Sequence, residues 1–301
     1  MNKNFIFSII IPHKNIPDLL QRCLDSIPDR DDIQIIIVDD NSDPDKVNFE
    51  SFSKLNKGNT EFYFPKEGKG AGYARNVGLK HAKGKWLIFA DADDFFMPCF
   101  NDSLDLYANN ENDIIYFRST SVDSKTLEQQ HRHKSWNNLL CKIQQTNNWN
   151  LAILIVPPWG KFIKHDLVKQ NNFVFQEVPY SNDVLFSTQT TVSTSKKIIS
   201  DDEIYCITYR SDSLTGNLTA KEAHMRIKVA SEASLYLKKI GRKERYYMDI
   251  FGILYCVGLF RTDYKRGLSL TLGWCKYQNE HIKNAILSKF LSSFRRMRRK
   301  L

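Results

Sequence analysis

Two nearly continuous β-branched segments near the N-terminus constrain the fold more than any other feature of the sequence. "FSIIIP" (7–12) and "IQIIIVDD" (33–40) lack the polar alternation of a half-exposed strand, which is typical of strands covered on both faces of a parallel sheet. Residues 16–27 between them place apolar side chains at helical spacing: Leu19, Leu20, Cys23, Leu24 and Ile27. This βαβ pattern predicts an α/β protein.

The following 150 residues continue the alternation. Further strands are predicted at 60–65, 86–90, 113–117 and 203–210, and a helix at 71–84 with Gly84 as its stop. Residues 118–150 indicate loop and short helix, 157–175 a turn, a short helix and a strand, and 178–192 a loop that opens a helix. The fold class is therefore a mostly parallel central sheet flanked by helices, and the helical pattern after residue 219 predicts a C-terminal helical extension.

The charge distribution predicts a boundary near residue 220. Residues 1–220 carry 24 Lys and Arg against 28 Asp and Glu, whereas residues 221–301 carry 19 against 6, so the whole net charge of +9 comes from the last quarter. We therefore expect two regions, an α/β domain over 1–220 and a basic helical region over 221–301. The apolar stretch at 250–260 has eleven residues, too few to span a bilayer as a helix.

Cysteine spacing and the N-terminus exclude several classes. The 6 cysteines form no Cys-x-x-Cys pair, which argues against a zinc knuckle or a disulfide framework and favours reduced thiols in the cytoplasm. The apolar N-terminal run is interrupted by Pro12 and His13 and has no small-residue cleavage site. We interpret it as a strand, not as a secretion signal.

Acidic residues follow two of the predicted strands. Asp39 and Asp40 end the strand at 33–40, and Asp91, Asp93 and Asp94 follow the strand at 86–90. Open parallel sheets bind ligands beyond the carboxyl ends of their strands, so we expect both clusters to border one crevice. Carboxylates are rarely buried without a partner, which predicts a cation beside them. Solvated turns or helix caps are the structural alternative for each cluster.

Five segments in order carry a resemblance to a known family: "IIIPHKN", "IIVDDNSD", "GAGYARNVGLKHAKGKWLIFADADD", "PWGKFIKHDLVKQNNFVF" and "NDVLF". Together they resemble the family 2 glycosyltransferases with the GT-A fold, which build bacterial capsule and lipopolysaccharide glycans, over roughly residues 5–215. The resemblance implies inverting transfer of a hexosyl or N-acetylhexosaminyl group from a nucleotide-diphospho-sugar, most commonly UDP-linked. It also implies a divalent cation, Mn²⁺ or Mg²⁺, and a glycan or lipid-linked glycan acceptor.

The resemblance also assigns donor-side roles. "DAD" matches the DxD motif, in which Asp93 would bind the metal and Asp91 the ribose or the metal shell, because a hard cation bridging the phosphates prefers carboxylate oxygens. Asp39 would contact the base edge, whereas Asp40 would support the turn. The nucleoside pocket would be lined by Pro12, His13 and Asn15. A surface histidine is the alternative for His13, a departure from the residue usual there.

Further positions match the family around the diphosphate and the acceptor. Arg75 would lie beside the base or diphosphate, with a surface ion pair as its alternative. Tyr209 and Arg210 resemble a loop that closes over the diphosphate. The alternative for these two residues is a strand end with a solvated arginine. Trp159 resembles an acceptor-side aromatic that stacks on a sugar ring, with buried packing as its alternative.

Asp183 is the predicted catalytic base. Inverting displacement needs a base on the face opposite the departing diphosphate. Asp183 matches the second position of the family's Glu-Asp motif, whereas the first position is Asn182, a departure from the pattern. An alternative role for Asp183 is only the N-terminal cap of the next helix.

Other functions compete with this interpretation. A metal-dependent nucleotidyltransferase also uses strand-end carboxylates, but needs a basic glycine loop near the first strand that "IPHKNIPD" does not supply. A basic nucleic-acid-binding protein fits the pI of about 9.1, but residues 1–220 are net acidic, so we expect no nucleic acid partner. A catalytically inactive relative is disfavoured by the intact Asp91, Asp93 and Asp183.

The C-terminal segment "SKFLSSFRRMRRKL" (288–301) has an amphipathic pattern. Its apolar residues can share one helical face while basic residues occupy the rest. This predicts peripheral contact with an anionic membrane, on the inner face of the cell membrane of a cytoplasmic enzyme. A solvated terminal helix is the alternative.

Overall fold

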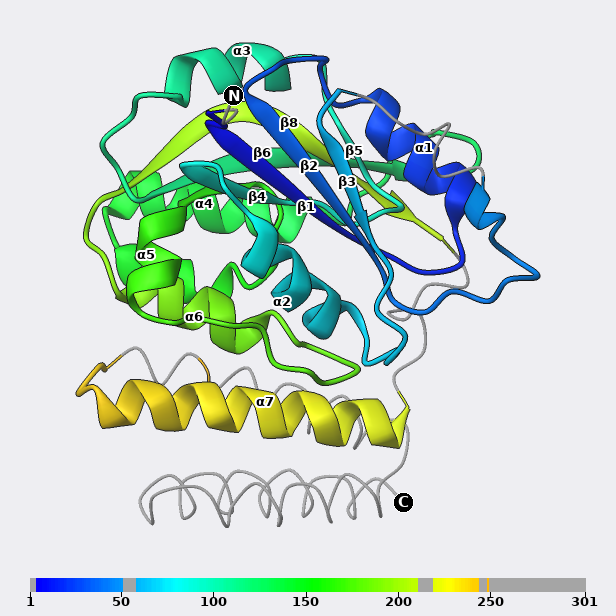
Figure 1. The fold of residues 1–301 in the computed structure, drawn as a ribbon. Coiled ribbons are helices and arrows are strands. Elements are labelled where there is room, and N and C mark those ends of the chain that lie inside the picture. Colours follow the sequence, from blue (N-terminus) through cyan, green and yellow to red (C-terminus); the bar gives the residue numbers. More distant parts are fainter. Residues whose placement is uncertain (1–3, 51–57, 211–218, 244–247, 249–301) are drawn as a thin grey trace. The chain divides into compact units, whose positions relative to one another are not determined.

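The structure is a computed structural model, and it describes residues 4–50, 58–210, 219–243 and 248 (Figure 1). The chain divides into two compact units, Met1–Asn217 and Leu218–Leu301. The predicted apolar stretch at 250–260 and the tail at 288–301 lie outside the described residues. The functional boundary near residue 220 stays a prediction.

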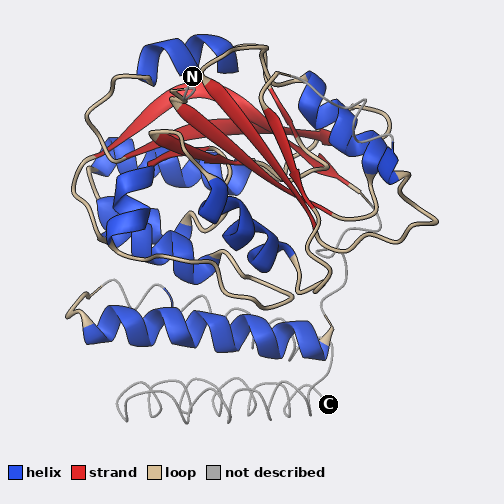
Figure 2. Ribbon diagram, viewed as in Figure 1, coloured by secondary structure: helices blue, strands red, loops and turns tan. Residues whose placement is uncertain are grey.

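The first unit is built on one eight-stranded sheet with the order β3-β2-β1-β4-β7-β6-β8-β5 (Figure 2). The strands are β1 (Phe7–His13), β2 (Ile33–Asp39), β3 (Thr60–Tyr63), β4 (Trp86–Phe89), β5 (Phe95–Phe96), β6 (Ile114–Asp123), β7 (Lys161–Lys164) and β8 (Lys197–Tyr209). β1, β2, β3 and β4 pair in parallel, whereas β7 is antiparallel to both β4 and β6. β8 is parallel to β6 and antiparallel to β5. The strands that precede the two acidic clusters, β2 and β4, therefore lie in the parallel part of the sheet.

Helices cover both faces of the sheet. They are α1 (Pro17–Asp25), α2 (Ala71–His81), α3 (Phe100–Tyr107), α4 (Lys134–Thr146), α5 (His165–Gln170) and α6 (Val184–Val192), with a 3₁₀ helix η2 at Trp149–Leu154. α1 and α3 lie on one side of the sheet and α2 and α6 on the other (Figure 1). The continuous β-branched runs therefore fold as strands that are buried from both sides.

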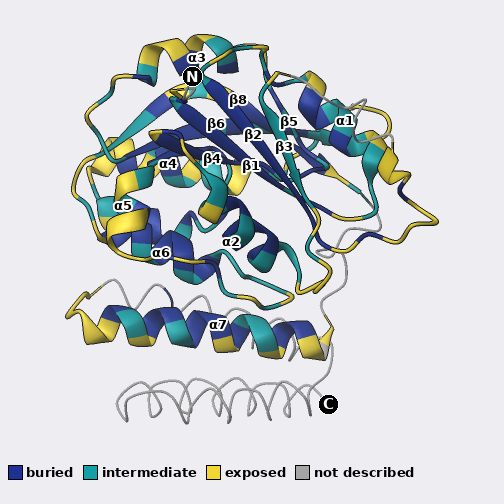
Figure 3. Ribbon diagram, viewed as in Figure 1, coloured by how far each residue is buried: buried dark blue, intermediate teal, exposed yellow. Residues whose placement is uncertain are grey.

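β1 shows how the two faces are filled. Phe7, Ile9 and Ile11 belong to the core cluster that includes Leu20 and Leu24 of α1. Ile10 points to the other face, where it meets α2 at a glycine: a Cβ added to Gly78 would lie 2.5 Å from Ile10 Cγ2. All four of these β1 side chains are fully buried (Figure 3). This close packing fixes the strands whose ends carry the candidate site.

Several predicted elements differ in extent. α2 ends at His81, and Gly84 instead allows close approach to β1, since an added Cβ would lie 2.5 Å from the Phe7 carbonyl carbon. β6 runs to Asp123 and α4 has 13 residues, where the sequence indicated loop and short helix. Pairing between β6 and β8 continues through a bulge over this polar stretch, so tertiary context overrode its weak strand signal.

The segment 157–175 folds in a different order from the predicted one. The strand is β7, which precedes α5 and pairs antiparallel with β4 and β6. Residues 173–175 are not a strand, because the backbone of Phe175 bonds to the side chain of Asn76: the Phe175 N–H donates to Oδ1 at 2.8 Å, and its carbonyl accepts from Nδ2 at 2.9 Å. A side chain thus replaces the strand ladder there.

The second unit contributes α7 (Ala220–Lys239). A capping box opens this helix: the Thr219 hydroxyl accepts the Glu222 N–H at 3.2 Å, and the Glu222 carboxylate accepts the Thr219 N–H at 2.9 Å. Within the part of the chain that the structure describes, none of the helices combines the length and the hydropathy needed to cross a membrane.

Candidate active site

The two predicted acidic clusters lie at the same edge of the sheet. β1 lies between β2 and β4 and is parallel to both, with His13 opposite Asp39 and Ile10 opposite Phe89. The carboxyl ends of the three strands therefore point the same way. The residues after β4, beginning with Ala90 and Asp91, continue from this edge. The parallel topology thus confirms that both clusters occupy the edge at which such sheets bind ligands.

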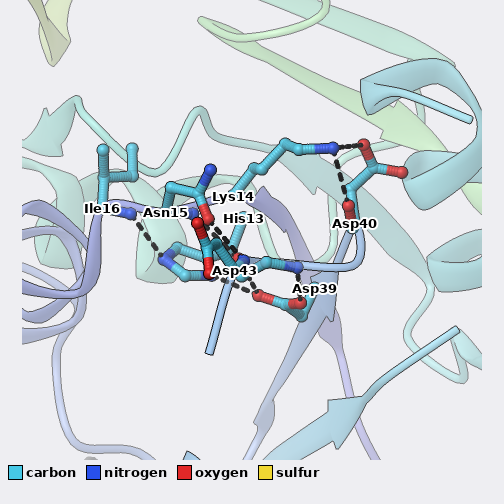
Figure 4. A network of polar contacts seen from close by, with 8 residues as sticks. His13, Lys14, Asn15, Ile16, Asp39, Asp40 and Asp43 are labelled. Atoms are coloured by element: carbon cyan, nitrogen blue, oxygen red, sulfur yellow. Dashed lines mark hydrogen bonds and ion pairs between the residues drawn. The ribbon is translucent and has the colours of Figure 1, made fainter. Parts of the chain in front are cut away.

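A network of buried hydrogen bonds holds Asp39 at the end of β2 (Figure 4). His13 Nε2 accepts the Ile16 N–H at 3.2 Å, so Nδ1 carries the ring proton and donates it to Asp39 at 2.7 Å. The same carboxylate accepts the Ser42 N–H at 2.8 Å and the Ser42 hydroxyl at 2.6 Å. Burial alone would raise the pKa of Asp39, but the hydrogen bonds from His13 and Ser42 lower it below its usual value. Asp39 is therefore held as a carboxylate.

The other predicted nucleoside residues shape the same loops. His13 is 1% exposed and both its ring nitrogens are engaged within the protein, so the structure gives it the task of orienting Asp39 rather than that of a surface histidine. The Asn15 N–H donates to Ser42 Oγ at 2.8 Å, and its side-chain oxygen accepts the Asp43 N–H at 2.8 Å. Pro12 is half-buried near the end of β1. These residues order the loops after β1 and β2.

Asp40 supports the turn, as predicted. Its N–H donates to the His13 carbonyl at 2.8 Å, and its carboxylate accepts from the Lys14 ammonium at 3.1 Å. The other carboxylate oxygen accepts the N–H of Gly70 at 2.9 Å. Gly70 immediately precedes α2 and has φ 93°, a conformation that favours glycine. Asp40 thereby connects the end of β2 to the start of α2.

The turn at Asp91–Asp94, after β4, is fastened by hydrogen bonds from α1 and β8. The Asp93 carbonyl accepts from Arg22 Nη2 at 2.7 Å and from the Thr208 hydroxyl at 2.8 Å. The Asp94 carboxylate is buried and accepts the Thr208 N–H at 2.7 Å. Asp94 therefore does not cap the next element of the chain, because its side chain bonds across to β8.

The Asp91 and Asp93 carboxylates remain partly exposed and face arginines. Asp91 Oδ1 lies 2.6 Å from Arg75 Nη2, and Asp93 Oδ2 lies 3.4 Å from Arg210 Nη2. Burial raises the pKa of Asp93, the nearby negative charge of Asp91 raises it further, and Arg210 opposes the rise. The cations expected beside these carboxylates are therefore arginines, and they do not fully offset the negative charge.

The chemistry of this pair fits a hard divalent cation that a ligand helps to bind. No group of three or more His, Cys, Asp or Glu within the described ranges could hold a metal alone. Mg²⁺ is usually bound in proteins by one or two carboxylates together with substrate phosphates and water. Asp91 and Asp93 supply two such carboxylates, and their mutual repulsion would be relieved by a cation.

Asp183 precedes α6, but its side chain makes no capping hydrogen bond. The structure thus does not support its alternative role as a helix cap. Burial raises the pKa of Asp183, Arg75 opposes this rise, and Asp91 adds to it. Arg75 Nη1 donates to Asn182 Oδ1 at 2.7 Å while Nη2 contacts Asp91. One guanidinium therefore bridges the turn after β4 and the turn before α6.

Gly72 of α2 lets the helix pack closely against the turn before α6, because glycine has no side chain. A Cβ added to Gly72 would overlap the Gln176 carbonyl oxygen and would lie 3.0 Å from the Asn182 Cβ. The helix can therefore approach the segment 176–182 closely. The guanidinium of Arg75 also lies over the Phe175 ring, 5.4 Å from its centroid.

Aromatic residues border the site on the side of β8. The Trp159 ring stacks on Tyr205 with centroids 5.5 Å apart and an interplanar angle of 13°, and it meets Trp136 edge to face at 5.0 Å. Trp159 is partly buried: it packs against the core cluster and keeps part of its surface exposed. Tyr209 ends β8 at 38% exposed, and Arg210 is the next residue.

Three residues at this site were not found from the sequence: Arg22, Tyr205 and Thr208. Their main contacts at the site are to backbone groups of the Asp91–Asp94 turn or to its buried Asp94, so their roles depend on tertiary pairing. The one available signal was the charged Arg22 beside the apolar residues Cys23 and Leu24 of α1.

Comparison with models of protein families shows to which family this chain belongs. The model for glycosyl transferase family 2 matches residues 8–171, more than half of the chain. The chain belongs to glycosyl transferase family 2. The family assignment covers β1, β2 and β4 with both acidic strand ends.

Curated relatives of this family 2 glycosyltransferase are longer proteins. The glycosyltransferase GlyA of Streptococcus pneumoniae serotype 4 is 24% identical over 261 residues, which covers 81% of this chain and 36% of GlyA. The minor teichoic acid biosynthesis protein GgaB of Bacillus subtilis is 28% identical over 56% of this chain and 19% of GgaB. The chain thus spans about a third or less of these relatives.

Solved structures confirm the GT-A fold. The Staphylococcus aureus TarS fragment 1-349 in complex with UDP-GlcNAc matches with a TM-score of 0.68 at 19% identity, over 92% of this chain and 83% of the fragment. The mannosyltransferase PcManGT of Pyrobaculum calidifontis, in complex with GDP-Man and Mn²⁺, matches with a TM-score of 0.56 at 14% identity, over 95% of this chain and 79% of that one.

Proposed function

We propose that this family 2 glycosyltransferase transfers a sugar, with inversion, from a UDP-linked donor to a glycan or lipid-linked acceptor in bacterial surface polysaccharide synthesis. One observation carries the proposal: Arg75 bonds to Asp91 at 2.6 Å and to Asn182, beside Asp183, at 2.7 Å. A donor-side carboxylate and the proposed base are thereby held on either side of one guanidinium.

On the donor side, Asp39 would receive the base of the nucleotide. An ionised carboxylate can accept about four hydrogen bonds. Ser42 and His13 supply three to Asp39, which leaves capacity for a donor such as the imino N–H of uracil. Pro12 and Asn15 would border the nucleoside through the loops that they order.

The diphosphate would lie between the arginines and the Asp91–Asp94 turn. Asp93, with Asp91, would hold a divalent cation, Mn²⁺ or Mg²⁺, which when bound supplies charge stabilisation to the departing diphosphate. Arg210 and Arg75 already contact these two carboxylates and would share their hydrogen bonds with phosphate oxygens. Tyr209, at the exposed end of β8, would cover the diphosphate.

On the acceptor side, Asp183 would remove the proton of the attacking hydroxyl. The raised pKa of Asp183 makes this carboxylate a stronger base than an exposed aspartate. The charge of Arg75 keeps that pKa from rising further. The side chain makes no capping hydrogen bond and the residue is partly exposed, so a substrate hydroxyl could reach it. Trp159 would present its exposed part to the acceptor sugar, since an indole combines a large apolar ring with a polar N–H.

The comparisons support this choice of donor and acceptor. TarS, a poly(ribitol-phosphate) β-N-acetylglucosaminyltransferase of Staphylococcus aureus, is 23% identical over 68% of this chain, and it was solved with UDP-GlcNAc. GgaB is a minor teichoic acid biosynthesis protein. Both names point to surface polymers and the TarS complex points to a UDP-linked hexosaminyl donor.

Donor hydrolysis tests the proposal most directly. The protein should slowly release a nucleoside diphosphate from one of a panel of UDP-, GDP- and dTDP-sugars in the presence of Mn²⁺, with a UDP-sugar as the expected substrate. EDTA should abolish the release. Release of pyrophosphate from a nucleoside triphosphate and a sugar 1-phosphate, without donor hydrolysis, would instead show a nucleotidyltransferase and contradict the proposal.

Membrane contact through residues 288–301 is a separate part of the proposal. Five basic residues, Arg295, Arg296, Arg298, Arg299 and Lys300, would contribute about 1 kcal/mol each near an anionic surface. The protein should sediment with anionic liposomes at low salt, and truncation after Leu287 should release it while donor hydrolysis survives. Equal sedimentation of both forms would refute the role of this segment.

A further inference from the structure

Tyr205 lies where the donor side and the acceptor side of the site meet. It is in β8 and its side chain is fully buried. Its hydroxyl oxygen accepts the N–H of Asp91 at 2.8 Å, and its hydroxyl hydrogen bonds to the carboxylate of Asp94. Its ring stacks on Trp159 with centroids 5.5 Å apart. One side chain therefore touches both ends of the Asp91–Asp94 turn and the acceptor-side indole.

The hydroxyl is suited to this position because it can accept and donate at once. The N–H of Asp91 and the carboxylate of Asp94 need opposite partners, and a phenol supplies both. The Asp91 side chain projects from the backbone that this bond fixes. The Asp93 carbonyl is held separately by Arg22 and Thr208, so Tyr205 governs the two ends of the turn rather than its middle.

The aromatic ring of Tyr205 is held in place by packing against two other aromatic side chains. It packs edge to face against Phe96 at 5.5 Å, and Phe96 pairs with Tyr205 across β5 and β8. The Trp159 indole also stacks on the Tyr205 ring, nearly parallel at 13°. A shift of the indole would therefore press directly on the ring whose hydroxyl holds the turn, because close-packed interiors transmit displacement.

We propose that Tyr205 is a positioning residue that fixes Asp91, at the start of the Asp91–Asp94 turn, in register with the acceptor-side ring of Trp159. The inference rests on the proposed function, in which Asp91 and Asp93 take part in binding a nucleoside diphosphate with a divalent cation. It goes beyond that function by assigning the coupling between the two sides to one buried hydroxyl and its ring.

The test compares Tyr205→Phe with Tyr116→Phe. Tyr116 is also fully buried in the sheet, but its hydroxyl pairs with Thr191 of α6 at 2.9 Å, so its loss controls for general destabilisation. Calorimetry with UDP, in Mn²⁺ and in EDTA, is the readout besides activity. Tyr205→Phe should weaken UDP binding about tenfold in Mn²⁺ and less than twofold in EDTA, whereas Tyr116→Phe should change neither more than twofold.

A second pair tests the ring contact and does not depend on the folding of Tyr205→Phe. Trp159→Ala should weaken UDP binding in Mn²⁺ about threefold, while Trp136→Ala, which removes an edge-to-face contact to Trp159 and leaves the Trp159–Tyr205 stack in place, should leave it within the error of the measurement. Equal UDP affinities within each pair would overturn the inference. Absence of Mn²⁺-dependent UDP binding by the unaltered protein would instead contradict the proposed function, so the two failures are distinguishable.

Discussion

Two strand ends at one edge of the sheet carry carboxylates in opposite electrostatic states. Asp39, at the end of β2, accepts hydrogen bonds from His13 and Ser42, which hold its pKa below the usual value. Asp93, just after β4, has the neighbouring Asp91 and burial raising its pKa, with Arg210 at 3.4 Å as a partial offset. Position at a strand end therefore does not decide the role of an aspartate. The donors around it do: Asp39 is already stabilised by protein groups, whereas Asp93 is short of positive charge.

The largest expected effect comes from Asp183, the proposed base, which lies in the turn before α6 and belongs to neither of these strand ends. Asp183→Asn should lower the rate of sugar transfer roughly 10²- to 10⁴-fold, since it would remove the proposed proton acceptor. Steady-state transfer rates measure the effect, and calorimetry with UDP should show nearly unchanged affinity. A variant that fails mainly in nucleotide binding would place Asp183 on the donor side.

The second test removes charge from the strand end that lacks positive partners. Asp93→Asn should keep the fold and lower turnover about 10²-fold, because the charge stabilisation by a bound cation is worth several kcal/mol. Asp43→Asn is a matched control in the loop after β2, where the carboxylate accepts the exposed Asp45 N–H. Near-normal activity of Asp93→Asn that still responds to Mn²⁺ would refute the metal assignment.

The bridge between the two turns predicts a change in pH dependence. Arg75→Gln removes the cation that lowers the pKa of Asp183, so that pKa should rise. A general base must be deprotonated, so the acidic limb of the rate profile should move to higher pH, with about tenfold lower turnover near pH 7. Rates measured across pH check this. An unshifted acidic limb would show that Arg75 does not act on the base.

The smallest effect concerns the strand end that protein groups already satisfy. Ser42→Ala should reduce the free energy of unfolding by about 1.5 to 3 kcal/mol at pH 7, since it removes a hydrogen bond to a charged acceptor. Asp39 has a folded pKa below its unfolded value of about 3.9, so its contribution is complete above that pH and is lost as pH falls through the folded pKa. The difference between variant and unaltered protein should therefore shrink below about pH 4.

Ser187→Ala is the matched control for this titration. The Ser187 hydroxyl donates to the Val156 carbonyl, which does not titrate, so urea unfolding should show a stability difference that is independent of pH. A pH-independent difference for Ser42→Ala as well would mean that Ser42 stabilises the loop without acting on the ionisation of Asp39.

The strands that end at the two acidic clusters could be predicted from the sequence because their signals are local. Runs such as "IQIIIVDD" combine β-branched residues with a polar end, and β2 indeed spans Ile33–Asp39. The placement of Asp39 and Asp91 at one edge resulted from parallel topology alone. The order of elements in 157–175 was wrong, because the weak strand signal of β7 depends on pairing with β4 and β6.

The sequence by itself determined the α/β class, the resemblance to the family and the carboxylates that the chemistry requires, since each depends on residue type and short spacing. Only the tertiary structure decided which groups surround those carboxylates. It brought Arg75 between Asp91 and Asn182, His13 behind Asp39, and Tyr205 beneath the Asp91–Asp94 turn, pairs that lie 16 to 114 residues apart in the chain. Ionisation depends on burial and on donors within a few ångströms, and those are set by how distant segments pack, not by neighbours in the sequence.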